Sequence, residues 1–343
     1  MKDERATPWA PAGTRAGYVA LVGRPNVGKS TLLNAMVGEK LSIVTPRAQT
    51  TRERVTGILT TDTAQIVFVD TPGLLEPSYL LQRSMLEAAL GAVADSDLVL
   101  LLLDATRAED ALPDAKALEA LIALKDELFV AINKIDAGNA GAIERLAAWS
   151  REVLGREPYR VSAMTGAGVE RLRDDLIAAL PESPFLYPPD EIAVQPVRFF
   201  VAEMVRETIF EEFHEEIPYS TAVRIEEFRE NAEPIYIRAE IVVERESQKA
   251  ILIGRGGAGI RLIGQRSREK IEAFLGARVY LDLWVKSVPG WRRKRGALRQ
   301  LGYAVPADEE ESGGGAGRQE RKKRRDRDRK PGGSVRGHGP RGQ

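Results

Sequence analysis

The sequence has no cysteine among its 343 residues and only two histidines, His214 and His338. The first absence excludes disulfides and thiolate metal sites, and the second excludes a metal centre built from several histidines. The longest apolar run, Leu98 to Leu103, is far shorter than the ~20 residues of a membrane-spanning helix. The mixed charges of residues 1–5 are followed by no apolar stretch of the kind that a secretory signal needs. We therefore expect a soluble protein that works in the cytoplasm.

The chain also has no net charge, with 50 Lys and Arg against 50 Asp and Glu, but the charges are unevenly placed. Residues 318–343 carry 11 basic and 3 acidic side chains, a balance of +8, so the rest of the chain sums to −8. We expect the acidic and then basic tail, 303–343, to be disordered and the N-terminal extension, 1–16, to be flexible. Three interpretations of the tail stay open: an arm for RNA phosphates, a solubilising tail, and a peripheral contact with the inner face of the cell membrane.

Between these termini the pattern predicts two domains. From 17 to 180, short apolar runs alternate with amphipathic segments, which is typical of a doubly wound, mostly parallel α/β sheet that binds ligands where its strands end. Residues 181–190 contain four prolines and predict a semi-rigid linker. Residues 191–302 follow the order α-β-β-α-α-β, which indicates a smaller α+β domain.

The most informative motif is Gly23-Arg24-Pro25-Asn26-Val27-Gly28-Lys29-Ser30, which lies between an apolar run at 18–22 and a helical pattern. Strand, glycine-bounded loop and helix are the context of a phosphate-binding loop, in which backbone N–H groups and the helix N-terminus face the phosphates. Lys29 supplies a positive charge and Ser30 a hydroxyl for Mg²⁺, while the glycines let the backbone approach closely. We predict that the residues from Gly23 to Thr31 bind a nucleoside triphosphate.

A second motif, Asp70-Thr71-Pro72-Gly73, follows the apolar run at 65–69. A carboxylate at such a place can hold Mg²⁺ through a water, and the backbone N–H of Gly73 can reach a γ-phosphate. Thr51, in the stretch between the two motifs, offers another hydroxyl to the metal. We expect Ser30, Thr51 and Asp70 to hold Mg²⁺, and we expect hydrolysis to depend on Lys29, Thr51, Asp70 and Gly73.

A third motif predicts that the base is guanine. Asn133-Lys134-Ile135-Asp136 follows the apolar run at 128–132, and the carboxylate of Asp136 can accept both N–H donors of guanine, a pair that adenine lacks. Asn133 can tie this loop to the phosphate loop through its amide, and the aliphatic stem of Lys134 can lie on the flat base. Ser162 and Ala163, after a further short strand, can place backbone N–H groups on the guanine oxygen.

The second domain contains Gly254-Arg255-Gly256-Gly257 between two predicted helices. A GxxG turn of this kind clamps about four nucleotides of single-stranded RNA in KH domains. We expect this turn to be too crowded for a Cβ, Arg255 to add charge, and Arg261 and Arg266 on the next helix to contact RNA. The alternative for these two arginines is an ordinary exposed helix surface.

These motifs resemble the TrmE–Era branch of P-loop GTPases, and their combination with a KH domain resembles the Era family over residues 17–302. The resemblance implies a GTPase that uses GTP, GDP and Mg²⁺, binds near the 3′ end of small-subunit ribosomal RNA and assists maturation of the small ribosomal subunit. We expect a monomer that binds no DNA.

Leu74 stands where many GTPases have a water-orienting glutamine, which implies slow intrinsic turnover. The resemblance suggests a K⁺ ion near Asn26 as a helper, and a purely structural role for that amide is the alternative. A GTP-binding RNA scaffold with negligible hydrolysis and a GTPase at a membrane surface are the alternative functions.

Overall fold

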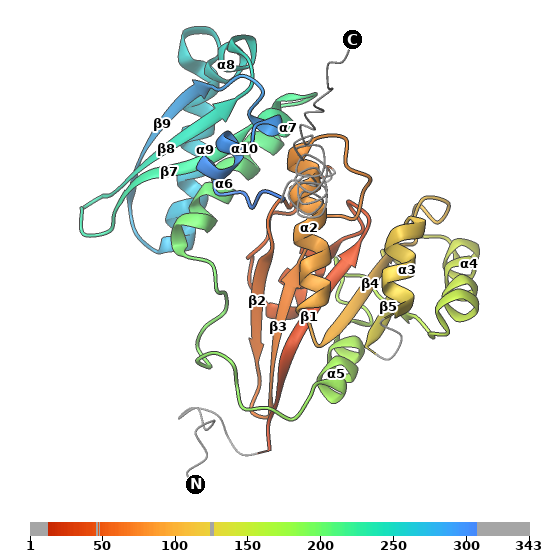
Figure 1. Ribbon diagram of the computed structural model, residues 1–343. Coiled ribbons are helices and arrows are strands. Elements are labelled where there is room, and N and C mark those ends of the chain that lie inside the picture. Colours follow the sequence, from red (N-terminus) through yellow and green to blue (C-terminus); the bar gives the residue numbers. More distant parts are fainter. Residues whose placement is uncertain (1–12, 46, 48, 124–126, 307–343) are drawn as a thin grey trace, which may run out of the picture. The chain divides into compact units, whose positions relative to one another are not determined.

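The computed structural model describes residues 13–45, 47, 49–123 and 127–306 (Figure 1). Most of the predicted N-terminal extension and of the predicted tail lies outside these described residues. Within them, no helix is long and apolar enough to cross a membrane.

The first part of the chain forms a six-stranded sheet in the order β2-β3-β1-β4-β5-β6. β2 runs antiparallel to β3, and all other neighbouring strands are parallel, so the predicted doubly wound, mostly parallel sheet is confirmed. Its elements are β1 (Arg15–Gly23), α1 (Lys29–Val37), β2 (Val55–Thr60), β3 (Ala64–Asp70), α2 (Leu80–Ala94), β4 (Leu98–Asp104), α3 (Ala115–Ala123), β5 (Leu128–Asn133), α4 (Ala140–Trp149), a π-helical turn (Ser150–Leu154), β6 (Tyr159–Arg160) and α5 (Val169–Ala179).

Two apolar cores lie on the two faces of this sheet. Leu32 of α1 and Leu172 of α5 belong to one core, whereas Ala89 of α2, Leu121 of α3 and Leu146 of α4 belong to the other. The run of Leu and Val in β4 is buried along its whole length, as expected of a central strand with helices on both sides. The carboxyl ends of β1, β3 and β5 therefore bring the three sequence motifs to one edge of the sheet.

The part of the chain after residue 196 forms a three-stranded sheet in the order β7-β8-β9. Its helices pack on one face, where Val205, Leu252 and Ile263 meet Ile237 and Ile241 of β8. The predicted α-β-β-α-α-β order is confirmed, but α7 and α10 were not predicted because they are too short to show a helical period. The elements are α6 (Val197–Glu212), α7 (Ile217–Ser220), β7 (Ala222–Arg229), β8 (Ile235–Val243), α8 (Glu246–Ile253), α9 (Ala258–Leu275), β9 (Val279–Ser287), a 3₁₀ turn (Trp291–Arg293) and α10 (Arg295–Gln300).

The proline-rich segment between the two sheets is bonded to the first of them through Gln65. The side chain of Gln65 on β3 is buried, and its Oε1 accepts from the backbone N–H groups of Leu186 at 2.8 Å and Tyr187 at 2.9 Å. Its Nε2 donates to the carbonyl of Tyr187 at 2.9 Å. One buried amide thus fixes the middle of this segment on the sheet.

The edge strand β2 is covered by the residues that follow. The backbone N–H of Ile58 donates to the carbonyl of Ile192 at 2.9 Å, and the hydroxyl of Thr56 donates to Oε1 of Gln195 at 2.8 Å. The chain therefore follows β2 before α6 begins.

A further apolar cluster joins α2 to the end of the described chain. Leu81 and Met85 of α2 pack with Trp291, Leu298 and Tyr303, and all five side chains are buried. The segment after β9 thus packs on the helix that follows the Asp70 motif.

Candidate functional site

The loop from residue 23 to residue 28 connects β1 to α1, and close contacts require glycine at both ends of it. A Cβ on Gly28, whose φ is +98°, would lie 2.3 Å from Nδ2 of Asn133. A Cβ on Gly23, whose φ is +149°, would lie 2.6 Å from the carbonyl oxygen of Leu102. Helix α1 begins directly after Gly28, and the first backbone N–H groups of a helix have no partner within it, so they are suited to an anion.

Lys29 is buried at the base of this loop. Its side-chain Nζ donates to the carbonyl oxygens of Gly23 at 3.2 Å and Arg24 at 3.1 Å. Burial lowers the pKa of Lys29 to about 8, and the attraction of Asp70 acts in the opposite direction. A phosphate beside this ammonium group would restore its usual pKa, so the site favours an anionic ligand.

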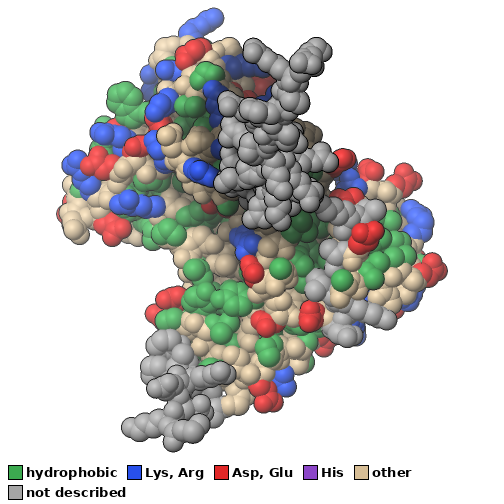
Figure 2. Space-filling view, in the orientation of Figure 1, with side chains coloured by type: hydrophobic (Ala, Val, Ile, Leu, Met, Phe, Trp, Pro, Cys, Tyr) green, Lys and Arg blue, Asp and Glu red, His purple; other side chains and the backbone are tan. Residues whose placement is uncertain are grey.

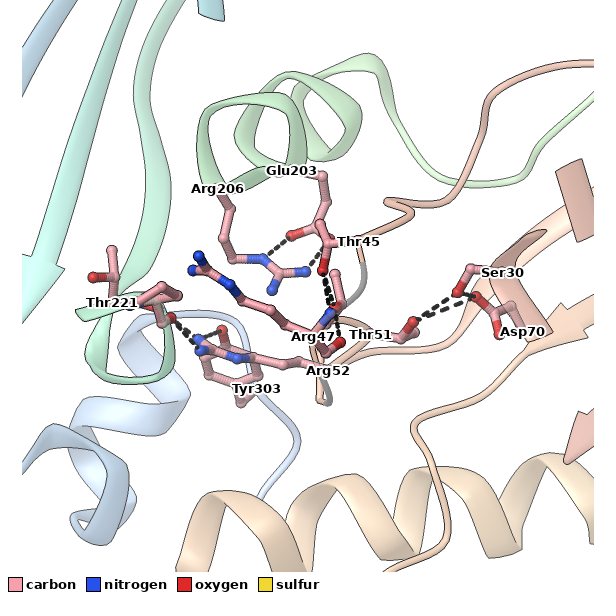
Figure 3. Close-up of polar contacts among 12 residues, drawn as sticks. Ser30, Thr45, Arg47, Thr51, Arg52, Asp70, Glu203, Arg206, Thr221 and Tyr303 are labelled. Atoms are coloured by element: carbon pink, nitrogen blue, oxygen red, sulfur yellow. Dashed lines mark hydrogen bonds and ion pairs between the residues drawn. The ribbon is translucent and has the colours of Figure 1, made fainter. Parts of the chain in front are cut away.

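The oxygen-bearing side chains of Ser30, Thr51 and Asp70 meet at the start of α1 (Figure 3). The hydroxyl of Ser30 donates to Oδ2 of Asp70 at 2.6 Å and lies 3.0 Å from Oγ1 of Thr51. Burial raises the pKa of the Asp70 carboxyl above its ordinary value, although Lys29 and the neighbouring hydroxyls oppose the shift. The other carboxylate oxygen of Asp70, Oδ1, is buried and has no hydrogen-bond partner among the described residues.

These side chains fit Mg²⁺. The ion prefers oxygen ligands and keeps several of its waters, and a buried carboxylate oxygen without a partner is an atom that a cation or its water would satisfy. In the part of the chain that the structure describes, no group of three or more His, Cys, Asp or Glu could hold a metal. The cluster therefore suits a metal that takes its remaining ligands from water and phosphate.

The segment that follows β3 lies against the phosphate loop. The backbone N–H of Leu74 donates to the carbonyl of Gly23 at 3.0 Å, and a Cβ on Gly73 would lie 2.6 Å from the backbone nitrogen of Pro25. The side chain of Leu74 is 5% exposed and belongs to an apolar core, so it does not face the cavity described below. The two remaining members of the motif, Thr71 and Pro72, are buried.

Asn133 joins two loops that are far apart in the sequence. Its Nδ2 donates to the carbonyl of Val27 at 2.8 Å, and its Oδ1 accepts from the backbone N–H of Ala163 at 2.9 Å. Asn133 is 1% exposed, and Ser162 beside Ala163 is fully buried. The phosphate loop and the loop after β6 are therefore held together by one side chain.

Lys134 and Asp136 lie on the turn after β5. Lys134, whose φ is +62°, donates through Nζ to the carbonyl of Asn26 at 2.6 Å and pairs with Asp104 at 2.6 Å. The side chain of Asp136 is exposed. The turn thus presents an exposed acidic residue beside a lysine that is anchored to the phosphate loop.

A cavity of about 470 Å³ lies at this edge of the sheet, within the usual size of ligand pockets. The predicted residues that line it are Pro25, Asn26, Gly28, Lys29, Ser30, Thr31, Thr51, Gly73 and Lys134. Seven other lining residues were not predicted: Ile43, Val44, Thr45, Gln49, Thr50, Arg107 and Met164. Gln49 and Thr50 adjoin the predicted Thr51, whereas only the fold brings the other five to the cavity.

A second candidate site is the turn between α8 and α9. Its glycines have left-handed φ values of +71° at Gly254, +60° at Gly256 and +81° at Gly257. A Cβ on Gly254 would lie 2.7 Å from the backbone nitrogen of Gly259, whereas a Cβ on Gly256 would meet no atom within 4 Å. The prediction of a crowded turn is therefore wrong for Gly256, where the backbone angle and not the space favours glycine.

Arg255 lies in this turn, and the helix after it carries Arg261 and Arg266. All three are exposed, but Arg266 forms an ion pair with Glu212 of α6. Lys or Arg and Asp or Glu side chains are interspersed over the visible face of this part of the chain (Figure 2). Arg255 and Arg261 are thus the predicted arginines that are best placed to meet a phosphate.

Comparison with known proteins identifies the family of this chain. Residues 18–134 match the family described as 50S ribosome-binding GTPase, and residues 216–292 match the KH domain. The GTPase Era of Geobacter metallireducens is 41% identical over 292 residues, which cover 84% of this chain and 98% of that protein. The chain belongs to the Era family of GTPases. GTPase Era of Synechocystis is 42% identical over 302 residues, 87% of this chain and 95% of the relative.

Solved Era structures confirm the fold. A variant of Era from Aquifex aeolicus bound to GDP·AlF4⁻ is 40% identical with a TM-score of 0.77, and it is matched over 85% of this chain and 100% of that one. Era in complex with MgGDPNP and nucleotides 1506–1542 of 16S ribosomal RNA is 41% identical with a TM-score of 0.80 over the same shares. This Era-family chain is therefore a GTPase with a P-loop domain and a C-terminal KH domain.

Proposed function

We propose that this Era-family GTPase binds GTP or GDP with Mg²⁺ in the cavity beside Lys29 and binds small-subunit ribosomal RNA through its KH domain. In this role it assists the maturation of the small ribosomal subunit. The supporting observation is that one chain carries both sites, a hydroxyl and carboxylate cluster at the phosphate loop and an exposed GxxG turn. The related Era structure that holds MgGDPNP and 16S ribosomal RNA is matched over its whole length.

At the nucleotide site, Lys29 would neutralise charge on the phosphates, and the backbone N–H of Gly73 would reach the γ-phosphate. Ser30 and Thr51 would ligate Mg²⁺ directly and Asp70 through a water, and the bound ion would stabilise charge on the transferring phosphoryl group. Leu74 cannot orient the attacking water because its side chain is apolar and buried. Turnover would therefore be slow. A K⁺ ion near Asn26 would supply further positive charge. Hydrolysis at equal rates in K⁺ and Na⁺ would exclude this role of K⁺.

Guanine selection would come from Asp136, whose carboxylate accepts two N–H groups of the base. Lys134 would cover one face of the base with its aliphatic stem. Asn133 would hold the loop of Ser162 and Ala163 beside the base. The predicted bonds from these two residues to the guanine oxygen would need their backbone N–H groups, which donate in this structure to the carbonyl of Ala167 and to Oδ1 of Asn133, both at 2.9 Å.

At the RNA site, the GxxG turn would hold the sugar–phosphate chain, with Arg255 and Arg261 beside it and Arg266 farther along α9. We propose the domain boundaries 17–180, 181–190 and 191–302 as the units of these two functions. A ribosomal RNA partner favours the cytoplasm as the place of action. Attachment to a membrane would depend on the tail, and loss of liposome binding on its removal would support that role.

The RNA site can be tested with two variants that differ only in place. Gly256 and Gly276 lie at opposite ends of α9 with φ values of +60° and +63°, and a Cβ on either meets no atom within 4 Å. Gly256→Asp adds a carboxylate where the phosphates should lie, and Gly276→Asp adds the same group and the same backbone cost elsewhere. We expect the first to lower affinity for an RNA equivalent to 16S nucleotides 1506–1542 by at least about tenfold, and the second to leave it unchanged. Equal affinities of the two variants would refute the KH assignment, and GTP binding should be normal in both.

A further inference from the structure

Arg52 follows Thr51 directly, but its guanidinium group is bonded to the KH part of the chain (Figure 3). Its Nη1 donates to the carbonyl of Thr221 at 2.6 Å, and its Nη2 donates to the carbonyls of Pro218 and Tyr219, both at 3.1 Å. These carbonyls lie in and just after the short helix α7. Three of the donors on one arginine are thus used to fix the segment after Thr51.

Aromatic side chains surround the same guanidinium group. Its central carbon lies 5.9 Å from the ring centre of Trp291, and Nη1 lies 3.5 Å from the hydroxyl of Tyr303. Trp291 and Tyr303 stack at 6.0 Å, and the Nε1–H of Trp291 donates to the carbonyl of Ser220 at 2.9 Å. The pocket that holds Arg52 is therefore itself fixed by packing and hydrogen bonds.

Moving the Arg52 side chain out of this pocket would cost free energy, because its charge is buried. Arg52 is 6% exposed, and among the described residues no carboxylate forms an ion pair with it, so backbone carbonyls satisfy its charge. A lysine has one nitrogen in place of the planar fork and cannot reach all three carbonyls in the same way. Arg47, on the other side of Thr51, donates to the carbonyl of Phe213, so the segment is attached to the KH part at both ends.

We infer that Arg52 is a positioning residue for GTP hydrolysis, because its attachment to the KH part holds the hydroxyl of Thr51 beside Ser30 and Asp70. Adjacent Cα atoms are ~3.8 Å apart, so a displacement of Arg52 moves Thr51 with it. The Thr51 hydroxyl lies 3.0 Å from Ser30 Oγ and 3.5 Å from Asp70 Oδ2, which leaves little room for a shift. The inference rests on the proposed role of Thr51 as a ligand of Mg²⁺.

The chain offers a matched control in Arg54. It lies two residues further along the same segment, but its Nε donates to the carbonyl of Ala88 at 2.7 Å and its Nη1 pairs with Asp95 at 3.0 Å, both within the GTPase part. We expect Arg52→Lys in the full chain to slow single-turnover GTP hydrolysis about 10- to 100-fold and to raise the Mg²⁺ concentration needed for half-maximal rate. GDP affinity should stay within about twofold, and Arg54→Lys should change neither quantity by more than that. Normal hydrolysis by Arg52→Lys would overturn the inference.

A double mutant separates this inference from the role of Thr51. Thr51→Ala should itself slow hydrolysis, and Arg52→Lys should add little on that background, since it acts through the same hydroxyl. Full hydrolysis by Thr51→Ala would refute the proposed metal ligand. A slow Thr51→Ala variant whose rate falls again by the full factor on adding Arg52→Lys would show that Arg52 acts elsewhere. Thermal unfolding checks that each variant is folded, and Arg52→Gln, which keeps a donor and loses the charge, replaces Arg52→Lys if that variant unfolds.

Discussion

Replacement of Asn133 by alanine tests whether one amide holds the nucleotide site together. The change removes the partners of the Val27 carbonyl and the Ala163 N–H, which lie 2.8 and 2.9 Å from the Asn133 side chain. Both residues are buried, so water cannot easily replace the lost bonds. An unsatisfied buried backbone group costs ~1–3 kcal/mol, which gives ~2–6 kcal/mol for the pair. Urea unfolding should show this loss, and GTP and GDP affinities should fall by a similar factor because both nucleotides use these loops.

Asn139 provides the control for Asn133→Ala. Its side chain caps α4 by accepting from the backbone N–H of Ala142 at 2.8 Å, so Asn139→Ala should cost ~1 kcal/mol and leave nucleotide affinity unchanged. A Cβ on Gly28 would lie 2.3 Å from Nδ2 of Asn133, so Gly28→Ala should be less harmful when Asn133 is already alanine. Asn133 does not hold the two loops together if Asn133→Ala unfolds as readily as Asn139→Ala and binds GDP normally.

Three further results are expected. Asp136→Asn should shift the base preference from GTP towards XTP by ~2–4 kcal/mol, and an unchanged ratio of the two affinities would exclude Asp136 as the reader of the base. Leu74→Ala should cost ~2–5 kcal/mol of unfolding free energy through a core cavity but slow single-turnover hydrolysis only modestly; a thousandfold loss of rate with intact GTP affinity would contradict this. Burial and the neighbouring Glu203 raise the pKa of Glu53 from 4.5 to about 7, while Arg206 and Arg52 oppose the shift. Because the folded state favours the protonated form, stability should fall as the pH rises from about 4.5 to 7, so Glu53→Gln should stabilise the fold by ~1–3 kcal/mol at pH 8 and by nothing near pH 4. A gain that is the same at both pH values would refute this origin.

The fold and the motifs of the nucleotide site could be predicted because their signals are local. The phosphate loop needs glycines at fixed spacing between a strand and a helix, and all of these are adjacent in the sequence. The alternation of strands and helices then implies that the carboxyl ends of β1, β3 and β5 meet at one edge. The positions of the Asp70 and Asn133 motifs beside the phosphate loop follow from that topology.

The features that were missed depend on contacts between distant residues. Nothing in the sequence around Arg107 or Met164 shows that either lines the cavity, because each reaches it only through the fold. In the sequence, Arg52 is an ordinary polar residue of a loop, because its hydrogen-bond partners lie about 170 residues away. The open space at Gly256 depends on the path of the backbone after the turn, which the GxxG pattern does not determine.

The path of the chain along β2 has a practical consequence for dividing this protein. An edge strand with unpaired N–H and carbonyl groups invites pairing with another molecule, and natural proteins protect such edges. Here the residues at Ile192 and Gln195 cover part of β2, and Leu186 and Tyr187 satisfy the buried amide of Gln65. A stand-alone GTPase domain that ends at residue 180 would lose both protections and should self-associate. A fragment that ends just after Gln195 would keep the residues that cover β2 and should be monodisperse.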